Sequence, residues 1–245
     1  MTNYKITIQY DGSRYKGWQK LGDSDNTIQS KLEKILKTNY EKDIEVIGTS
    51  RTDAGVHALM QCANFKLENE VSIYDLQQLF NRYLPEDISV IRVEIVDDRF
   101  HARYNVASKT YLYKIWNRSY SNPFIRKYSM HVEESLDMEK MIKAAEYLIG
   151  EHDFTAFSTA SSKKKSMVRT IDSIDITRDE GIIYIRIKGK SFLYNMVRRI
   201  AGTLIEVGSG NIKPKKVEEL LTSKIRKSTG LIAESKGLHL EKIEY

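Results

Sequence analysis

The first half of the chain alternates short apolar runs with amphipathic segments. Apolar and polar residues alternate over Tyr4–Tyr10, which is the period of a strand that buries one face. Similar strand-like runs occupy residues 44–48, 60–67 and 88–96. Between them lie two segments with helical spacing, one capped by Asn26 or Thr27 and one that runs from Ser72 to a stop at Pro85. The resulting order, β-α-β-β-α-β, is that of a ferredoxin-like unit.

The second half repeats this order of elements without repeating the residues. Strands are predicted at residues 109–116, 170–178, 182–190 and 238–245, with a hairpin turn at Asp179-Glu180-Gly181. Helices are predicted at 136–149, at 192–208 after a cap at Ser191, and after Pro214. We therefore expect an α+β fold of two ferredoxin-like halves, residues 1–104 and 105–245, that share a mainly antiparallel sheet flanked by helices. No Gly/Ser/Pro-rich linker separates them.

The composition is that of a globular protein and leaves the partner open. Of the 245 residues, 41% are hydrophobic and 29% are charged, and the net charge is +6. This excess suits a polyanionic partner, and the 15 tyrosines could offer rings to bases or simply pack the strand faces. No apolar run approaches membrane length, and the first residues read as a strand rather than a signal peptide. With Cys62 as its only cysteine, the chain is expected to be cytoplasmic and free of internal disulfides.

The stretch GTSRTDAGVHAL, residues 48–59, joins the second and third predicted strands. An ordinary turn explains part of it, because Asp53 favours Asx turns and Gly55 supplies a positive φ. Arg51, however, lies two residues before Asp53, so in an extended approach both side chains point to one face. A nearby guanidinium would hold the Asp53 carboxylate ionised, and an ionised carboxylate on a rigid loop suits chemistry at a sugar or at an electrophilic base carbon.

Several familiar chemistries are missing from the sequence. The five histidines are scattered, and no Cys/His set has zinc spacing. There is no Walker-type glycine loop, no dinucleotide fingerprint and no G-x-S-x-G motif. If the chain is an enzyme, the sequence therefore predicts one without metal or cofactor, built around Asp53.

Candidate nucleic-acid contacts combine cations with aromatic rings. They are Arg14, Tyr15, Lys16 and Trp18 in YDGSRYKGWQ; His57, Arg103 and Lys109; and Arg169 and Arg199. For the first loop, the alternative is a surface loop pinned by Trp18. For the basic connection Ser161–Thr170, a solvated loop is favoured over a phosphate-contacting one.

Arg198 and Arg199 stand in FLYNMVRRI, a helix that is otherwise strongly apolar. Adjacent helical positions differ by about 100°, so the two side chains cannot share a direction. An arginine that points into a buried interface needs a carboxylate partner, and Asp53 is a candidate.

Four segments together resemble the TruA family of tRNA pseudouridine synthases: YDGSRYKGWQ, RTDAGVHA, FHAR with TYLY, and SFLYNMVRRIAGTLIEVG. The resemblance covers most of the chain and implies the pseudouridine synthase fold, homodimers, tRNA as substrate, and no metal or organic cofactor. It implies that Asp53 is the catalytic aspartate and that Arg51 places the flipped nucleotide. It also implies that Tyr111 stacks on the target uracil and that Arg198 pairs with Asp53. The reaction implied is isomerisation of uridine in the anticodon arm, at positions 38, 39 or 40.

The chain departs from the family pattern in two places. GTSRTD replaces the common GAGRTD, and AESKGL, residues 233–238, replaces a segment that usually reads Ala-Pro-Ala before Gly-Leu. These changes suit a divergent paralogue with an altered RNA target. A non-catalytic tRNA-binding protein or chaperone is a separate alternative that stays open. The signature strand of RRM modules is absent, and an RNA glycosidase would need a second carboxylate.

Overall fold

The computed structural model describes residues 1–159, 166–225 and 229–245. These residues form two compact units, Met1–Ala107 with His239–Tyr245 (unit 1) and Ser108–Leu238 (unit 2). The sequence placed the division at 104/105 and assigned the last strand to the second half. In the structure, residues 239–245 belong to unit 1, because the last strand lies against a strand of that unit.

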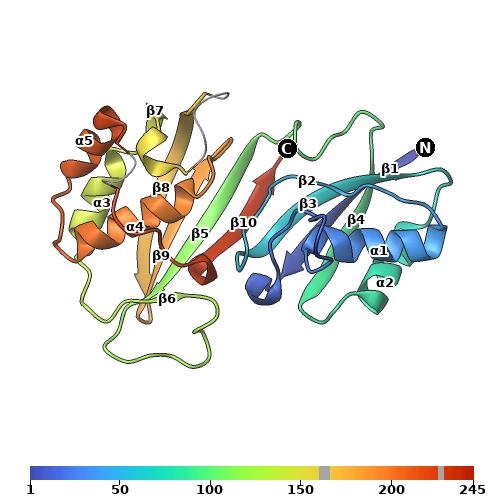
Figure 1. Cartoon of the computed structure of the whole chain (residues 1–245), viewed down its shortest axis with the longest axis horizontal. Coiled ribbons are helices and arrows are strands. Elements are labelled where there is room, and N and C mark those ends of the chain that lie inside the picture. Colours follow the sequence, from blue (N-terminus) through green and yellow to red (C-terminus); the bar gives the residue numbers. More distant parts are fainter. Residues whose placement is uncertain (160–165, 226–228) are drawn as a thin grey trace. The chain divides into compact units, whose positions relative to one another are not determined.

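Unit 1 is a sheet with two helices packed on it (Figure 1). Its elements are β1 (Thr2–Tyr10), α1 (Ile28–Tyr40), β2 (Ile47–Gly48), β3 (His57–Leu67), α2 (Ile73–Tyr83), β4 (Ile88–Val96) and β10 (Leu238–Glu244). Central strand β1 is antiparallel to β3 and β4, β2 pairs with β3, and β10 runs parallel to β3. The predicted ferredoxin-like order of the first half is confirmed.

Local sequence explains the elements of unit 1. Tyr4, Ile6 and Ile8 alternate along β1 and are fully buried, as the period of the sequence predicted. The side chain of Thr27 accepts a hydrogen bond from the Ser30 N–H, which caps α1 as expected.

Strand β2 is shorter than predicted, with two residues instead of five. The reason is a pair of side chains from α1. Gln29 donates to the carbonyl of Val46 at 3.2 Å, and Glu33 accepts from the Val46 N–H at 3.1 Å. The backbone of residue 46 is therefore satisfied by the helix and does not join the sheet.

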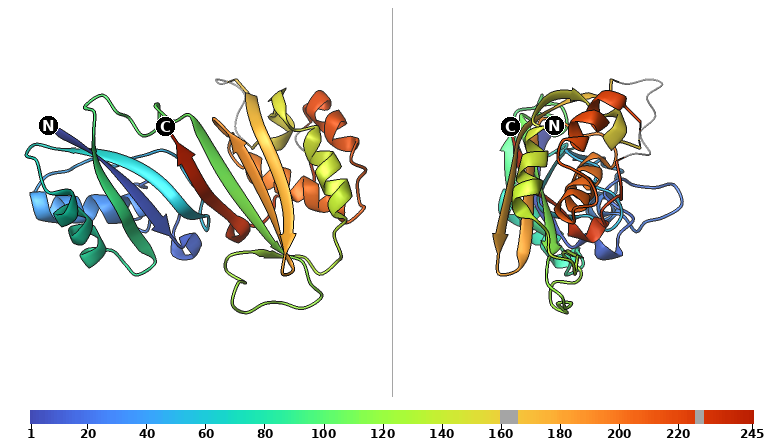
Figure 2. Two further views of the ribbon diagram at one scale, coloured as in Figure 1. Left: turned by 180° about the vertical axis from the view of Figure 1, so that it is seen from behind. Right: turned by 90° about the vertical axis from the view of Figure 1, so that its left-hand side faces the viewer.

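Unit 2 contains a further set of paired strands together with helices α3, α4 and α5 (Figure 2). Its elements are β5 (Ser108–Trp116), β6 (Met130–His131), α3 (Met138–Glu146), β7 (Gly150–Asp153), β8 (Val168–Asp179), β9 (Ile182–Gly189), α4 (Met196–Gly208) and α5 (Lys216–Ser223). Strands β5, β9, β8 and β7 pair in that order, all antiparallel, and β6 joins β5 in parallel. The predicted hairpin is confirmed, with positive φ at both Glu180 and Gly181. The short strands β6 and β7 were not predicted.

Helix α4 begins at Met196, so the predicted cap at Ser191 is wrong. Asn195 has a left-handed conformation with φ of 59°, which ends any helix that would precede it. The Asn195 amide donates to Thr159 Oγ1 at 2.9 Å, and the Tyr194 carbonyl accepts from the Thr159 N–H at 3.2 Å. A tertiary contact therefore keeps residues 192–195 out of the helix to which the apolar pattern assigned them.

Candidate active site

The loop that carries Asp53 begins at residues anchored to β3. The Thr49 N–H donates to the Cys62 carbonyl at 2.9 Å, and the Thr49 hydroxyl donates to the same oxygen at 3.0 Å. The next residue is held on both backbone groups by one side chain, since Gln61 accepts from the Ser50 N–H and donates to the Ser50 carbonyl. Thr49, one of the two family-atypical residues, also bonds through its hydroxyl to the Tyr245 hydroxyl at 2.6 Å. These hydrogen bonds continue the pairing of β2 with β3 and fix the root of the loop to β3.

The segment of residues 10–18 holds the other side of the loop. The Tyr10 hydroxyl bonds to Thr52 Oγ1 at 2.7 Å, and the Trp18 N–H donates to the Thr52 carbonyl at 3.0 Å. The approach is close at Gly17, whose φ is +100° and where a Cβ would lie 2.6 Å from the Thr52 carbonyl oxygen and 3.1 Å from the Asp53 carbonyl carbon. Only glycine fits there without displacing the backbone of Asp53. Sequence reasoning missed this positioning role, although YDGSRYKGWQ was singled out.

Burial corrects the prediction that this segment contacts RNA through its rings. Trp18 is fully buried, and its indole fills the space over Gly48, while Tyr15 is 5% exposed and donates its hydroxyl to Asp87. Neither ring is available to stack on a base. The Arg14 guanidinium is exposed but donates twice to the Asp87 carboxylate, which raises its pKa further. The alternative given above, a loop pinned by Trp18, is the one that the geometry supports.

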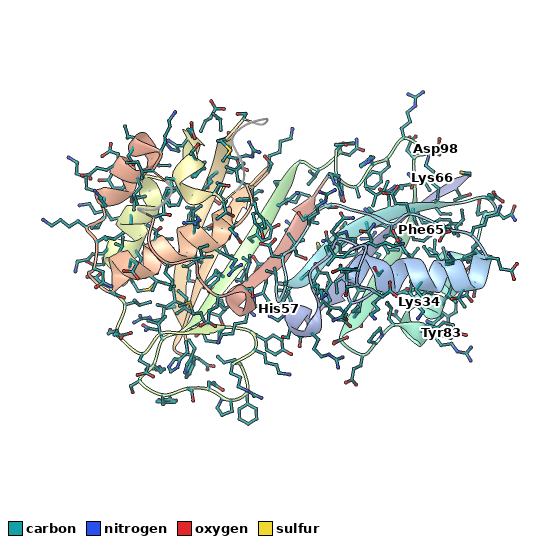
Figure 3. All side chains as sticks on the ribbon, viewed as in Figure 1. Lys34, His57, Phe65, Lys66, Tyr83 and Asp98 are labelled. Atoms are coloured by element: carbon teal, nitrogen blue, oxygen red, sulfur yellow. The ribbon has the colours of Figure 1, made fainter. Side chains whose placement is uncertain are left out.

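His57 is also a buried packing residue rather than a surface contact. Its ring is 2% exposed and stacks on the His239 ring with 4.8 Å between centroids. Figure 3 labels His57 among the side chains of the chain. Its Nδ1 accepts from the Gly12 N–H at 3.1 Å and lies 3.2 Å from the Asp11 carboxylate. The imidazole therefore ties the start of β3 to the turn after β1, and the predicted RNA contact through His57 is corrected accordingly.

Asp53 lies at the bend of this anchored loop. The Val56 N–H donates to the Asp53 carbonyl at 3.2 Å, and Gly55 has a φ of +75°, so the turn chemistry predicted from the sequence is present. Asp53 is half-buried, whereas Arg51 is exposed. Since Ser50 and Thr52 are anchored inward and buried, the chain presents Arg51 and Asp53 from a backbone fixed on two sides. A carboxylate held in this way is preorganised for chemistry on a ligand.

Unit 2 contains the other predicted catalytic residues. Tyr111 lies on β5 opposite Ile187, is 9% exposed, and meets the ring of Phe192 edge-on at 5.2 Å between centroids. Phe192 belongs to the segment before α4, so the FLYN part of the motif orients the tyrosine ring. Two residues on, Tyr113 is fully buried, and burial raises the pKa of its hydroxyl, which donates to the Glu234 carbonyl. Both tyrosines are therefore buried, Tyr113 completely and Tyr111 with a small exposed fraction.

Arg198 is fixed by the second family-atypical segment. Its Nε donates to the Ala233 carbonyl at 2.7 Å, and its carbonyl accepts from the Ala233 N–H at 3.2 Å. The charges that enter this segment pair with each other, because Lys236 lies 2.6 Å from the Glu234 carboxylate. Arg199 points elsewhere and donates to Thr229 Oγ1 at 2.8 Å, as the helical geometry predicted.

The remaining predicted RNA contacts are spread over both units. Lys16 is exposed, whereas Arg103, Lys109 and Arg169 are half-buried. Burial lowers the pKa of Arg169, whose guanidinium donates to the carbonyls of residues 166 and 168. Residues 161–165 of the basic connection Ser161–Thr170 lie outside the described residues. Asp53 and Arg51 belong to unit 1 and Tyr111 and Arg198 to unit 2, so their meeting stays a prediction.

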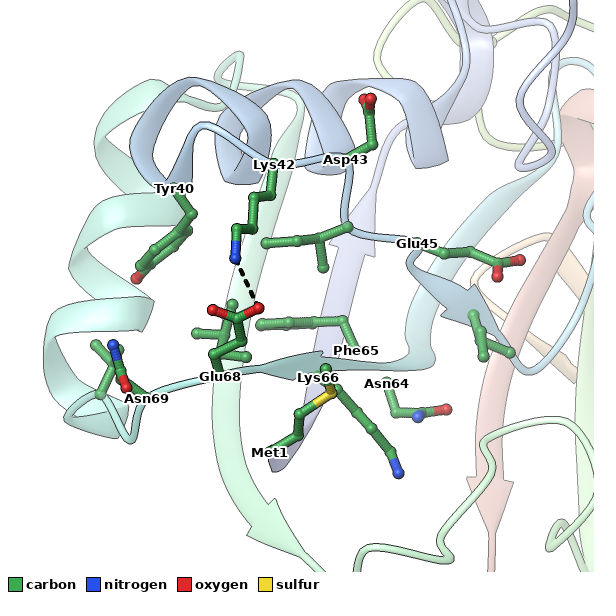
Figure 4. Close-up of a pocket in the computed structure, with 14 residues that line it drawn as sticks. Met1, Tyr40, Lys42, Asp43, Glu45, Asn64, Phe65, Lys66, Glu68 and Asn69 are labelled. Carbon is green, nitrogen blue, oxygen red and sulfur yellow. Dashed lines mark hydrogen bonds and ion pairs between the residues drawn. The ribbon is translucent and has the colours of Figure 1, made fainter.

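A separate hollow of about 580 Å³ lies beside β3 in unit 1 (Figure 4). Phe65 and Leu67, near the end of β3, are among its lining residues, and the ion pair of Lys42 with Glu68 spans 2.6 Å at its side. No predicted site residue lines it. The hollow is therefore distinct from the Asp53 loop, which precedes the opposite end of the same strand.

The described parts of the chain contain neither a cluster of metal ligands nor a helix able to span a membrane. Residues 1–159, 166–225 and 229–245 contain no group of three or more His, Cys, Asp or Glu placed to hold a metal ion. Over the same ranges, no helix has the length and apolarity needed to cross a membrane.

Comparison with known proteins decides the family. Residues 6–105 and 144–245 match a family described as tRNA pseudouridine synthase, and these ranges contain the whole Asp53 loop and Arg198. The chain belongs to the tRNA pseudouridine synthase family. The resemblance to TruA is thereby confirmed, and enzymes of this family are isomerases that act on uridine in tRNA. Tyr111 lies between the two matched ranges.

Relatives of this synthase family match over the full length. The chain is 54% identical over 245 residues to "tRNA pseudouridine synthase A 2" of Bacillus cereus (strain ZK / E33L) and 55% identical to "tRNA pseudouridine synthase A" of Bacillus sp. (strain KSM-64), with 100% of each chain covered. It is 46% identical to "tRNA pseudouridine synthase A 1" of Clostridium tetani (strain Massachusetts / E88), again with 100% of both chains covered. A solved structure titled "Crystal Structure of a Cbf5-Nop10-Gar1 Complex" matches at a TM-score of 0.38 and 15% identity, over 82% of this chain and 45% of that chain, which is too low to support a conclusion.

Proposed function

We propose that the chain converts uridine to pseudouridine at positions 38, 39 or 40 in the anticodon stem-loop of tRNA. The observation that carries the proposal is Asp53, a half-buried carboxylate on a turn that is anchored from β3 on one side and from residues 10–18 on the other. The relatives that match over the full length are named as tRNA pseudouridine synthases, which supports tRNA as the substrate class.

The reaction rearranges bonds within one nucleotide. The target uridine leaves the helical stack, the N1–C1′ bond breaks, the uracil turns, and C5 bonds to C1′. C5 loses its proton and N1 gains one, so atoms and charge balance and no cofactor takes part. Asp53 is the catalytic carboxylate, Tyr111 stacks on the uracil and assists the loss of the C5 proton, Arg198 pairs with Asp53, and Arg51 contacts the displaced nucleotide.

The remaining contacts are proposed for the tRNA backbone. Lys16, Arg103, Lys109, Arg169 and Arg199 are the cations retained from the sequence prediction, because phosphate contacts position a nucleic acid. We further propose that the protein acts in the cytoplasm as a homodimer, with the tRNA in contact with both subunits.

Tritium release from tRNA labelled at C5 of uridine tests the chemistry. Wild-type protein should release tritium, and Asp53→Asn should lower the rate by more than about 10³-fold, because the essential carboxylate is lost. Asp98→Asn is a matched control, since Asp98 is an exposed carboxylate of the same unit that pairs with Lys66. Equal rates for the Asp53→Asn and Asp98→Asn variants would refute the role of Asp53.

Mapping of pseudouridine in tRNA from cells with and without the protein tests the position. Loss confined to positions 38, 39 and 40 is expected. Loss at other positions would assign an altered target, the alternative that the Thr49-Ser50 departure raised. Unchanged pseudouridine together with retained tRNA binding would favour a chaperone.

A further inference from the structure

The loop of residues 117–129, between β5 and β6, carries an unusual surface. It extends from unit 2 beyond the ends of these strands (Figures 1 and 2). Phe124 is 90% exposed, which is the largest exposed fraction of any aromatic residue in the chain, and Tyr120 is 63% exposed. The loop lies between the two ranges that match the family, so the family match does not account for it.

The backbone of this loop is fixed by its own hydrogen bonds. The Trp116 indole N–H donates to the Tyr120 carbonyl at 2.6 Å, and a His131 ring nitrogen lies 2.9 Å from the Arg118 carbonyl. Nearer the tip, the Ile125 carbonyl accepts from the N–H of residue 128 at 2.8 Å and from the hydroxyl of residue 129 at 3.0 Å. The loop is therefore a closed unit of the Ω type, a class that is often functional. Phe124 is therefore exposed at the tip of a loop whose backbone is held by hydrogen bonds.

The sequence of this loop contains cations and no carboxylates, and the next acids along the chain are Glu133 and Glu134. Residues 117–132 include Arg118, Arg126 and Lys127 and no aspartate or glutamate. All three cations are exposed. Exposed aromatic rings interleaved with cations and free of acids are the composition of a surface that stacks on bases and contacts phosphates.

We propose that the loop of residues 117–129 is a second contact surface for tRNA, outside the catalytic loop. Phe124 stacks on an unpaired base or on the exposed end of a base-paired stem, and Arg118 and Arg126 contact the adjacent phosphates. This inference rests on the proposed function for the identity of the RNA. An ordered loop needs no such ring for its own stability, because Phe124 contributes almost no buried surface. This surface increases the affinity for tRNA and takes no part in the reaction.

Binding of full-length tRNA to the Asp53→Asn protein tests the proposal without turnover. Phe124→Ala should raise Kd about 5- to 150-fold, the loss of one base–aromatic stack, equal to about 1–3 kcal/mol. Phe124→Trp should restore binding, whereas Phe124→Leu should not, because leucine keeps the apolar contact and loses the ring face. Arg126→Gln should weaken binding to all tRNAs and reduce the slope of log Kd against log salt by about 1.

Matched controls come from α3 of the same unit. Ile142 is an apolar residue that is 43% exposed, and Lys143 is an exposed cation beside it. Ile142→Ala and Lys143→Ala should leave Kd unchanged. In the wild-type background, Phe124→Ala should raise KM and leave kcat at saturating tRNA unchanged.

Two results would overturn the proposal. One is a Kd for Phe124→Ala equal to that for Ile142→Ala. The other is a change of mass in sedimentation, from a dimer to a monomer on Phe124→Ala, which would assign the loop to contact between two copies of the chain. Failure of the proposed function is separate, because it appears in the pseudouridine map. A Phe124 effect on tRNA binding stands even if positions 38, 39 and 40 are unmodified.

Discussion

Replacing Gly17 by alanine adds one methyl group where two backbones meet beside Asp53. Gly17 has a φ of +100°, and the new Cβ would lie 2.6 Å from the Thr52 carbonyl oxygen, 3.1 Å from the Asp53 carbonyl carbon and 3.3 Å from the Ala54 nitrogen. All three contacts are backbone atoms of the catalytic loop, so no side chain can rotate away to relieve them. The substitution therefore pushes on Asp53 directly.

The structure sets the size of the effect. A positive φ costs a non-glycine residue about 1–2 kcal/mol, and overpacking adds about 1–3 kcal/mol, so the free energy of unfolding should fall by about 2–5 kcal/mol. Ordinary van der Waals contact begins near 3.4 Å, so relief of the 2.6 Å contact moves the loop by about 0.8 Å. A displacement of this order can lower a rate about 10²-fold when it acts on a reacting group. We expect kcat for tritium release to fall by about 10- to 100-fold at temperatures where the variant is folded.

Two other glycines serve as controls that separate the cost of a positive φ from the cost of the steric contact. Gly210 has a φ of +80° and open space around its Cβ position, whereas Gly22 has open space and no positive φ. Gly210→Ala should lower the free energy of unfolding, measured in urea, by only about 1–2 kcal/mol, the cost of the positive φ, and should leave kcat unchanged. Gly22→Ala should change neither quantity. If folded Gly17→Ala releases tritium within twofold of wild type, the claim that residues 10–18 position Asp53 is wrong.

Three further predictions concern the surroundings of the loop. Tyr245→Phe removes the hydroxyl bonded to Thr49, so urea unfolding should show a loss of about 1 kcal/mol. Thr49→Val removes the same bond and also the one to the Cys62 carbonyl, so the double variant should lose less than the sum of the two single losses; fully additive losses would contradict the coupling. Burial raises the pKa of the Cys62 thiol, so near neutral pH it should react with a disulfide reagent only after unfolding, and rapid reaction of the folded protein would be inconsistent with the structure. Burial, and then the hydrogen bond to Asp87, raises the pKa of Tyr15 from 10.0, so its contribution to stability is complete below pH 10.0 and is lost as the pH rises toward the folded pKa. Tyr15→Phe should remove this part of the alkaline decline in Tm, and an unchanged decline would count against it.

The centre of the candidate site was accessible from the sequence. RTDAGVHA marked Asp53 as the central residue and Arg51 as its neighbour, and the structure shows the expected turn with its positive φ at Gly55. The flanking aromatic segment was misread in part. The sequence alone does not show whether Tyr15 and Trp18 line a binding groove or pack in the core, because burial depends on which residues pack against them in the folded chain.

Two predicted boundaries of helices and strands were wrong, also because of contacts with distant residues. The apolar pattern over residues 192–195 fits a helix, yet Asn195 is left-handed because Thr159 bonds to it from a distant segment. Residues 44–46 read as strand, yet Gln29 and Glu33 of α1 satisfy the backbone of Val46. Local propensity amounts to a few tenths of a kcal/mol up to about 1 kcal/mol per residue, so a hydrogen bond from a distant side chain can override it.

The sequence by itself determined the order of the elements, the faces they bury and the residues able to do chemistry, because each of these depends on residues close together in the chain. The tertiary structure decided which of those residues support the loop and which it presents. Residues 10–18 lie more than 30 positions before Thr52, and their packing against it buries Trp18 and leaves Arg51 exposed. The stretch of residues 48–59 is therefore a turn by its local chemistry, and its place between β3 and residues 10–18 makes it a rigid support for Asp53.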